Sequence, residues 1–241
     1  MADRWASRLA RGILGTGRAN ACISVALAAL VFLGGRVYSF QNHGPAHVDL
    51  QTPLDAAIPL VKTFVLPYVV FDVYIFASLF VFMMLKTRTF QSAAFAFILA
   101  QGLSNLFFAF MQTEVARPAL VGSDVLTRIL RDVYASDPPF NAFPSLHVSL
   151  STNLAIHWRR LDRRSGGWAW ALSAVIIVST VFVKQHYLAD VAGGLILGWA
   201  CSSLPEALLP RGIGADECPE RSLFDLRGSA ACSPVQREAK D

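Results

Sequence analysis

The sequence carries little charge for its length. Of its 241 residues only 16% are Asp, Glu, Lys or Arg, whereas a typical soluble domain has about 25%. Hydrophobic residues make up 54% of the chain, and the mean hydropathy is positive, at +0.45. The surplus apolar residues fall in long runs. These features exclude an ordinary soluble domain and indicate a polytopic membrane protein.

Motifs for several common functions are also absent. The four cysteines have neither metal-type nor disulfide-framework spacing, so we expect unpaired thiols. No nucleotide-binding loop, dinucleotide fingerprint or basic stripe occurs, so nucleic acid is not an expected partner. His43 and His47 lie close together but lack a third ligand nearby in the sequence. We therefore expect no metal or other cofactor, and the oligomeric state stays open.

Six apolar stretches predict six membrane crossings. They cover approximately residues 20–39, 64–85, 90–111, 144–158, 167–184 and 186–204. A membrane-spanning helix needs about 20 residues, so the fourth stretch is short. In the sixth stretch, Gly194 and Gly198 form a small-x-x-x-small step that predicts close helix packing. The expected fold is all-α, a six-helix transmembrane bundle over residues 20–204.

The two flanks of this bundle differ from it. Residues 1–19 place arginines and apolar residues on different helical faces. This pattern predicts a basic amphipathic segment on an anionic leaflet, with a frayed basic tail as the alternative. Residues 205–241 are charged and show little apolar periodicity, so we expect a disordered cytoplasmic tail.

The distribution of Lys and Arg predicts the sidedness. Before the tail, one side holds ten of them: Arg4, Arg8, Arg11, Arg18, Lys86, Arg88, Arg159, Arg160, Arg163 and Arg164. The other side holds six: Arg36, Lys62, Arg117, Arg128, Arg131 and Lys184. The positive-inside rule then places both termini in the cytoplasm and loops 40–62 and 112–143 outside. The compact size and the arginine bias favour a bacterial inner membrane.

Two histidines and a carboxylate are predicted to meet on the outer face. His147 and His186 are 39 residues apart, and two crossings between them return the chain to the same face. Asp190 lies four residues after His186, so their side chains share one helix face. A carboxylate on one imidazole nitrogen leaves the other free to attack phosphorus. His147, in a first helical turn, can serve as general acid. The alternatives are a structural His–Asp pair and a surface histidine.

Cations are predicted on the same face. A phosphoryl group in transfer spreads negative charge over three oxygens, which fixed cations and amides stabilise. Arg117 can bind such a group as a fork and Lys184 as a point charge. Ser145 lies at the amino end of the fourth span, where backbone amides favour anions. For Arg117 alone, contact with lipid headgroups is the alternative.

One carboxylate lies within a span. Asp72 is about 12 Å below the outer end of the second span, from the helical rise per residue. Because a carboxylate inside a membrane is costly, we expect either a pocket role or a hydrogen bond to Asn105 or Gln101.

The motifs resemble those of the type-2 phosphatidic acid phosphatase superfamily. The similarity rests on Pro-Ser-Leu-His at 144–147, the His-x-x-x-Asp element at 186–190 and Arg117-Pro118 upstream. In that family the later histidine forms a phosphohistidine, the aspartate orients it and the earlier histidine protonates the leaving group. The resemblance implies these roles for His186, Asp190 and His147, and it places Arg117, Ser145 and Lys184 around the phosphate.

Two positions depart from the family pattern. Phe110 stands where the first motif has a lysine, and Ser179-Thr180 stands where the third has Ser-Arg. Lys184 is the candidate replacement for a missing cation. The wider motif forms, with Thr52-Pro53-Leu54-Asp55 upstream, look like the branch that contains inositol phosphorylceramide synthases.

Three functions remain open from the sequence. The first is a metal-independent phosphatase that hydrolyses a lipid phosphomonoester or diphosphate at the outer face through a phosphohistidine. The second is a lipid phosphotransferase that moves a phospho-headgroup onto a lipid hydroxyl. The third is a non-catalytic membrane scaffold or transporter. The lipid and its headgroup are not predicted.

Overall fold

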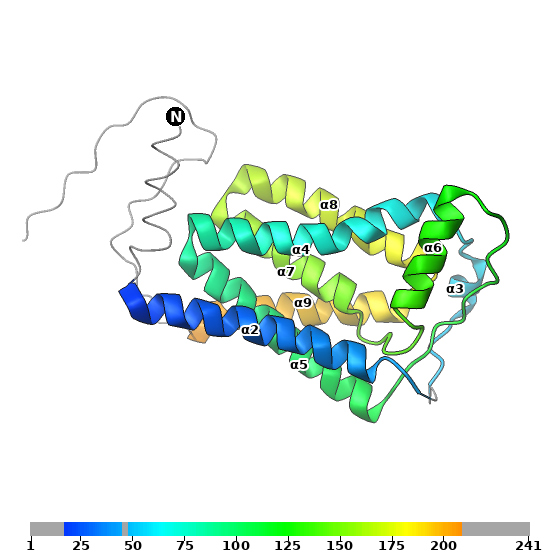
Figure 1. Cartoon of the computed structure of the whole chain (residues 1–241), viewed down its shortest axis with the longest axis horizontal. Coiled ribbons are helices and arrows are strands. Elements are labelled where there is room, and N and C mark those ends of the chain that lie inside the picture. Colours follow the sequence, from blue (N-terminus) through cyan, green and yellow to red (C-terminus); the bar gives the residue numbers. More distant parts are fainter. Residues whose placement is uncertain (1–16, 45–47, 209–241) are drawn as a thin grey trace, which may run out of the picture.

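The protein is an elongated bundle of long helices (Figure 1). Its structure, a computed structural model, describes residues 17–44 and 48–208. The long helices are α2 (Gly17–Gln41), α4 (Val65–Leu85), α5 (Thr87–Phe110), α7 (Leu146–Leu161), α8 (Arg163–Phe182) and α9 (Leu188–Leu208). The described residues form no β-strand, only two isolated bridges, Val48 with Thr113 and Glu114 with Phe140.

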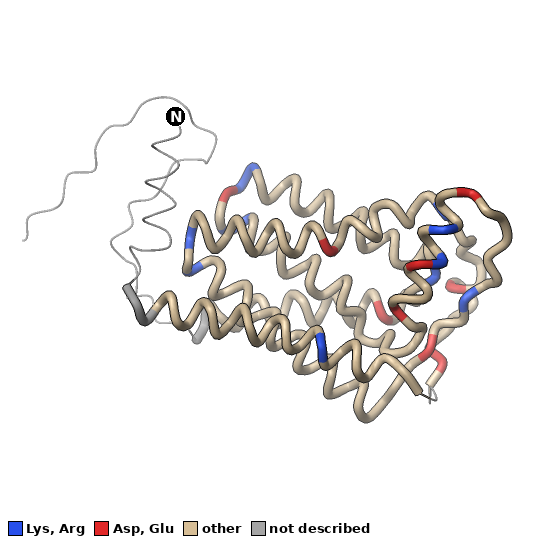
Figure 2. Tube along the Cα trace, in the orientation of Figure 1, with Lys and Arg blue, Asp and Glu red and all other residues tan. Residues whose placement is uncertain are grey.

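Five of the described helices are long and apolar enough to cross a membrane: α2, α4 with the preceding 3-10 turn η1 (Lys62–Phe64), α5, α8 and α9. Charged residues gather mainly at the two ends of the bundle (Figure 2). Large apolar side chains such as Phe76, Phe80 and Trp199 are exposed between those ends, as lipid contact requires. The predicted all-α membrane bundle is therefore confirmed. Helix α7 has only 16 residues, whereas a full crossing needs about 20, so the sixth crossing remains a prediction.

Helix α7 occupies the centre of the bundle. It packs against α5, α8 and α9, and its polar residues Ser149, Thr152 and Asn153 are fully or almost fully buried. Its approach to α9 is close, because a Cβ atom on Gly198 would lie 2.4 Å from the carbonyl oxygen of Ser149. The close packing predicted from the Gly194–Gly198 step is confirmed. It fixes two helices that carry site residues relative to each other.

Two short helices cover one end of the bundle, where the sequence indicated only polar loops. They are α3 (Pro53–Ala57) and α6 (Val125–Ser136). A capping box between Thr52 and Asp55 begins α3, and the Asp124 side chain caps α6 by accepting from the Thr127 amide at 3.0 Å. Leu130 and Val133 of α6 are buried in a small apolar cluster. Such short amphipathic elements lie below the length that a search for spans detects.

Both predicted flanks fall largely outside the described residues. Helix α2 begins at Gly17, so the basic segment predicted for residues 1–19 is described only at its last three positions. Helix α9 continues through Pro205 to Leu208, four residues into the predicted tail. The rest of that tail lies outside the described part of the chain.

Candidate active site

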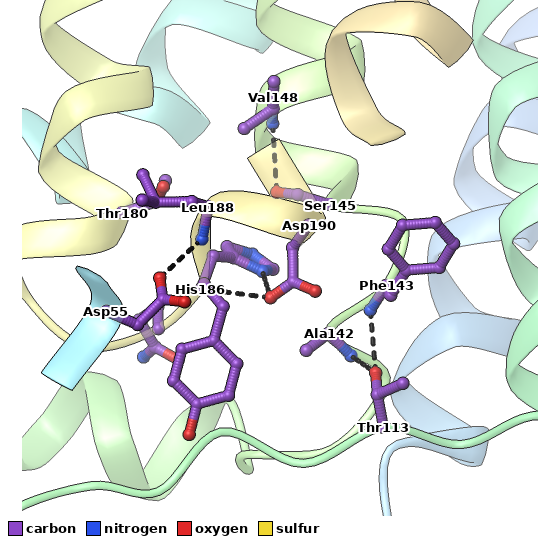
Figure 3. Close-up of polar contacts among 12 residues, drawn as sticks. Asp55, Thr113, Ala142, Phe143, Ser145, Val148, Thr180, His186, Leu188 and Asp190 are labelled. Atoms are coloured by element: carbon purple, nitrogen blue, oxygen red, sulfur yellow. Dashed lines mark hydrogen bonds and ion pairs between the residues drawn. The ribbon is translucent and has the colours of Figure 1, made fainter. Parts of the chain in front are cut away.

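The Asp190 carboxylate faces the His186 imidazole at the junction of α8 and α9. The Nδ1 atom of His186 lies 3.5 Å from Oδ2 of Asp190, and both side chains are buried (Figure 3). The same Oδ2 atom accepts a hydrogen bond from the Tyr187 amide at 2.8 Å. Asp190 therefore fixes both the imidazole and the backbone beside it. Because the carboxylate faces Nδ1, the lone pair of a neutral His186 can reside on Nε2.

The backbone around His186 is held from both neighbouring helices. The amides of Gln185 and His186 both donate to the carbonyl of Thr180, at 2.9 and 3.2 Å, which turns the chain sharply after α8. The carbonyl of Asp190 accepts from the Ser145 amide at 3.2 Å. This last bond joins the His186 segment directly to the residue that caps α7.

His147 lies in the first turn of α7, beside His186. Ser145 caps this helix by accepting from the Val148 amide at 3.3 Å. The ring centroids of His147 and His186 are 5.7 Å apart. The His147 ring also packs on Tyr68 and Phe71 of α4, with centroid distances of 4.7 and 4.4 Å. The structure thus brings the two histidines, Ser145 and Asp190 together from α7 and the α8–α9 segment.

Arg117 lies in the loop after α5, next to the same segment. Its guanidinium donates to the carbonyls of Tyr134 and Asp137, at 3.1 and 2.8 Å, and to the side-chain oxygen of Gln185. Its Nε atom is buried and has no hydrogen-bond partner among the described residues. Burial lowers the pKa of Arg117, an effect that neighbouring Asp137 opposes. Arg117 therefore positions Gln185, the residue before His186, and its Nε–H group is available to donate one further hydrogen bond.

Lys184 and Asp55 connect the His186 segment to α3. The Lys184 ammonium donates to the carbonyls of Asp55 and Ile58, and Lys184 adopts a positive φ of 57°. Asp55 accepts from the Leu188 amide, at the start of α9, at 2.8 Å (Figure 3). Burial raises the pKa of Asp55, but hydrogen bonds from Thr52 and Leu188 outweigh it and leave that pKa below its usual value. Asp55 of α3 and Ile58, the residue just after this helix, therefore bind α3 to the His186 segment.

A second carboxylate lies near His147 and was not singled out from the sequence. Asp137 accepts hydrogen bonds from Tyr38 at 2.7 Å, from Asn42 at 2.7 Å and from Tyr68 at 3.2 Å. The Tyr68 ring is the one stacked on His147. The signal available in the sequence was an aspartate before two prolines, which indicated a loop and gave no partner for the side chain.

Three other predicted positions lie apart from this arrangement. Asp72 is exposed on α4, and Asn105 donates instead to the carbonyl of Gly34 at 3.2 Å. Phe110, at the position of the motif lysine, is 83% exposed. Thr180 is fully buried, and its hydroxyl donates to the Ile177 carbonyl. Phe110 and Thr180, the two positions that differ from the family motifs, therefore provide no cation.

Within the described chain, no cluster of three or more His, Cys, Asp or Glu side chains is arranged to hold a metal ion. The donor groups at the site are imidazoles, one carboxylate behind His186, backbone amides and two cations. This set fits an anionic group with a central electrophilic atom better than a cation.

The comparison with protein families agrees with this geometry. The family described as the PAP2 superfamily matches residues 45–204, which is more than half of the chain and includes every site residue described above except Tyr38 and Asn42. No curated protein and no solved structure matches the chain. Members of this superfamily are generally phosphatases or phosphotransferases. From the matched residues, the chain belongs to the PAP2 superfamily.

Proposed function

We propose that the protein is an integral membrane lipid phosphatase that acts through a phosphohistidine on His186. The observation that carries the proposal is the pairing of two imidazoles with ring centroids 5.7 Å apart, one of them backed by a buried carboxylate. One phosphoryl group is small enough to contact both rings at this separation. The substrate class is a lipid phosphomonoester or diphosphate.

In the first half-reaction, Nε2 of His186 attacks phosphorus. The phosphorus–oxygen bond to the lipid breaks, and His147 gives a proton to the departing oxygen. Asp190 stabilises the positive charge that develops on the His186 ring. Since both side chains are fixed by buried contacts, little reorganisation accompanies this step.

In the second half-reaction, water attacks the phosphohistidine. His147, now neutral, takes the proton from that water, and inorganic phosphate leaves with restoration of His186. The transferred group carries negative charge throughout. Support for its binding comes from the unpartnered Nε of Arg117 and from the amides at the start of α7. The Lys184 ammonium donates to the carbonyls of Asp55 and Ile58, so it would have to leave them to contact the phosphate directly.

The second candidate is phosphotransfer to a lipid hydroxyl, as in the inositol phosphorylceramide synthase-like branch. Two observations favour it. His186 is only 6% exposed, and α3 is bonded directly to the segment that carries it, which restricts the approach of water. Residues Thr52 to Asp55, which resemble that branch, form this covering helix and its cap. The first half-reaction is identical in both candidates.

The proposed orientation places the site on the periplasmic or exterior face of a bacterial inner membrane, with both termini in the cytoplasm. Its support is the arginine-rich turn between α7 and α8, which lies at the end of the bundle away from His186 (Figures 1 and 2).

The test uses purified protein in lipid vesicles with a panel of labelled lipid phosphates, with and without lipid alcohols as acceptors. Release of inorganic phosphate supports hydrolysis, and a new labelled lipid supports transfer. His186→Ala should abolish both reactions, whereas the matched control His43→Ala, at an exposed outer-loop position, should not. No product from any substrate would favour a non-catalytic scaffold or transporter.

A further inference from the structure

An apolar groove lies between α4 and α8 in the half of the bundle away from the histidines. Its volume is about 520 Å³, within the range of small-molecule sites. The lining includes Tyr74, Val81 and Leu172, with Trp158 and Trp168 nearer the end of the bundle. The α8 residues of the groove end at Leu172, ten residues before the end of the helix at Phe182. That separation is about 15 Å at helical rise, and none of the lining residues belongs to the active site, although Tyr74 lies one helical turn from Phe71, which packs on His147.

Several polar side chains of the groove already have hydrogen-bond partners within the protein. The indole of Trp158 donates to the hydroxyl of Ser78 at 2.9 Å, and the Tyr74 hydroxyl accepts from Ser173 at 3.2 Å. A sugar or a nucleotide would find few partners on these walls, and its own polar groups would be desolvated without compensation. A hydrocarbon chain has no such requirement. The chemistry of the walls therefore selects an acyl chain.

The mouth of the groove is positively charged. Arg164 and Ser165 line it, and the turn between α7 and α8 contains Arg159, Arg160, Arg163 and Arg164 against the single carboxylate of Asp162. That carboxylate also caps α8, where it accepts from the amide and the hydroxyl of Ser165 at 2.7 and 2.8 Å, and the four arginines outnumber it by three. The turn thus presents a net positive charge at the level of lipid headgroups, which attracts an anionic group.

We propose that the groove binds one anionic phospholipid from the leaflet opposite the active site. One acyl chain occupies the space between α4 and α8, and the headgroup phosphate lies at Arg164. Trp168, which is 76% exposed, lies at the edge of the groove beside the headgroup level. This binding site is independent of the proposed chemistry at His186.

The experiment is native mass spectrometry of the full chain in detergent, with phosphatidylglycerol or phosphatidylcholine of identical acyl chains. We expect the wild-type protein to retain one phosphatidylglycerol molecule at least several-fold more than phosphatidylcholine. Arg164→Ala should remove that preference, whereas Arg163→Ala, one residue away but outside the lining, should keep it. Ala77→Trp, which fills the groove from an exposed position on α4, should lower retention of both lipids.

Three results would overturn the proposal. They are equal retention of the two lipids by the wild-type protein, equal loss of preference in both arginine variants, and unchanged retention in Ala77→Trp. Quenching of tryptophan fluorescence by brominated phosphatidylglycerol gives a second readout on the unaltered protein. Trp168→Phe should reduce that quenching, and its persistence in this variant at wild-type level would also contradict the site.

Discussion

Asp137 links loop 112–143 to His147, the proposed general acid, through a single tyrosine. Its carboxylate accepts from three side chains, and one donor, Tyr68, stacks on the ring of His147. The Arg117 guanidinium binds the carbonyl of the same aspartate and the side chain of Gln185. Asp137 and Arg117 therefore connect Tyr68, which packs on His147, with Gln185, which precedes His186. Asp137 and Tyr68 act as positioning residues in this arrangement, because neither is required to touch the phosphate.

Tyr68→Phe removes the hydroxyl and keeps the ring on His147. We expect kcat to fall roughly tenfold with KM almost unchanged, since one hydrogen bond to a charged group contributes about 1.5 kcal/mol. The measurement is steady-state turnover on the lipid phosphate identified in the vesicle assay. Tyr74→Phe is the matched control, because its hydroxyl bonds to Ser173 within the bundle. An equal loss of kcat in both variants would show that the effect is not specific to His147.

At the scale of helices, the contact between α7 and α9 sets the distance between His147 and the His186–Asp190 pair. Helix α7 begins just before His147 and α9 contains Asp190. Their backbones approach closely at Gly194 and Gly198, where an added Cβ would lie 2.7 Å from Ser145 O and 2.4 Å from Ser149 O. These neighbouring atoms belong to the backbone and cannot swing aside. A small change in this contact should therefore alter the position of His147 relative to His186.

Gly198→Ala should separate α7 from α9. We expect a loss of about 1–3 kcal/mol in stability from overpacking, together with lower turnover. The measurement is the thermal midpoint of the purified protein, paired with the activity assay. Gly102→Ala on α5 is the control, because nothing lies within 4 Å of its added Cβ. If Gly198→Ala proved as stable and as active as Gly102→Ala, the close contact would be refuted.

Helix α3 should contribute to the stability of the folded protein in a pH-dependent way. Because the pKa of Asp55 is held below its usual value by its hydrogen bonds, its stabilising effect is complete above the unfolded pKa of about 3.9. The effect is lost as the pH falls through the lower folded value. We expect Asp55→Asn to lower stability by about 1 kcal/mol near neutral pH, and the difference from wild type to shrink in acid.

Thermal unfolding of both proteins across the acidic range checks this expectation. Asp132→Asn, at an exposed position on α6, serves as the matched control and should show no comparable change. If the difference between wild type and Asp55→Asn stayed constant from neutral pH into strong acid, the ionised Asp55 carboxylate would not be the group that stabilises this contact.

For the molecule as a whole, long apolar runs were sufficient to predict an all-α membrane bundle, because each long helix must satisfy its own backbone within the membrane. Motif spacing was sufficient to bring His147 near His186 and Asp190, since two consecutive helices, α7 and α8, return the chain to the same end of the bundle. The contacts of Asp137 with Tyr38 and of Asp55 with Leu188 were not predictable. They join residues 99 and 133 positions apart, and nothing in either local sequence specifies such a partner.

The sidedness of the whole molecule is testable by labelling. A cysteine placed at Val121, which is 80% exposed in the outer loop, should react with a membrane-impermeant maleimide in intact cells. A tag at the carboxyl terminus should become accessible only after permeabilisation, as the positive-inside distribution predicts. The unaltered chain gives the background from its native cysteines. The opposite pattern of accessibility would reverse the proposed orientation.

The most direct measurement is to trap the covalent intermediate. Purified protein is mixed briefly with radiolabelled lipid phosphate, quenched under alkaline conditions that preserve phosphohistidine, and mapped by mass spectrometry. We predict one labelled phosphoryl group on His186, its absence in His186→Ala, and its slower appearance in His147→Ala. Product formation without a labelled enzyme, or a label on any residue other than His186, would contradict the proposed mechanism.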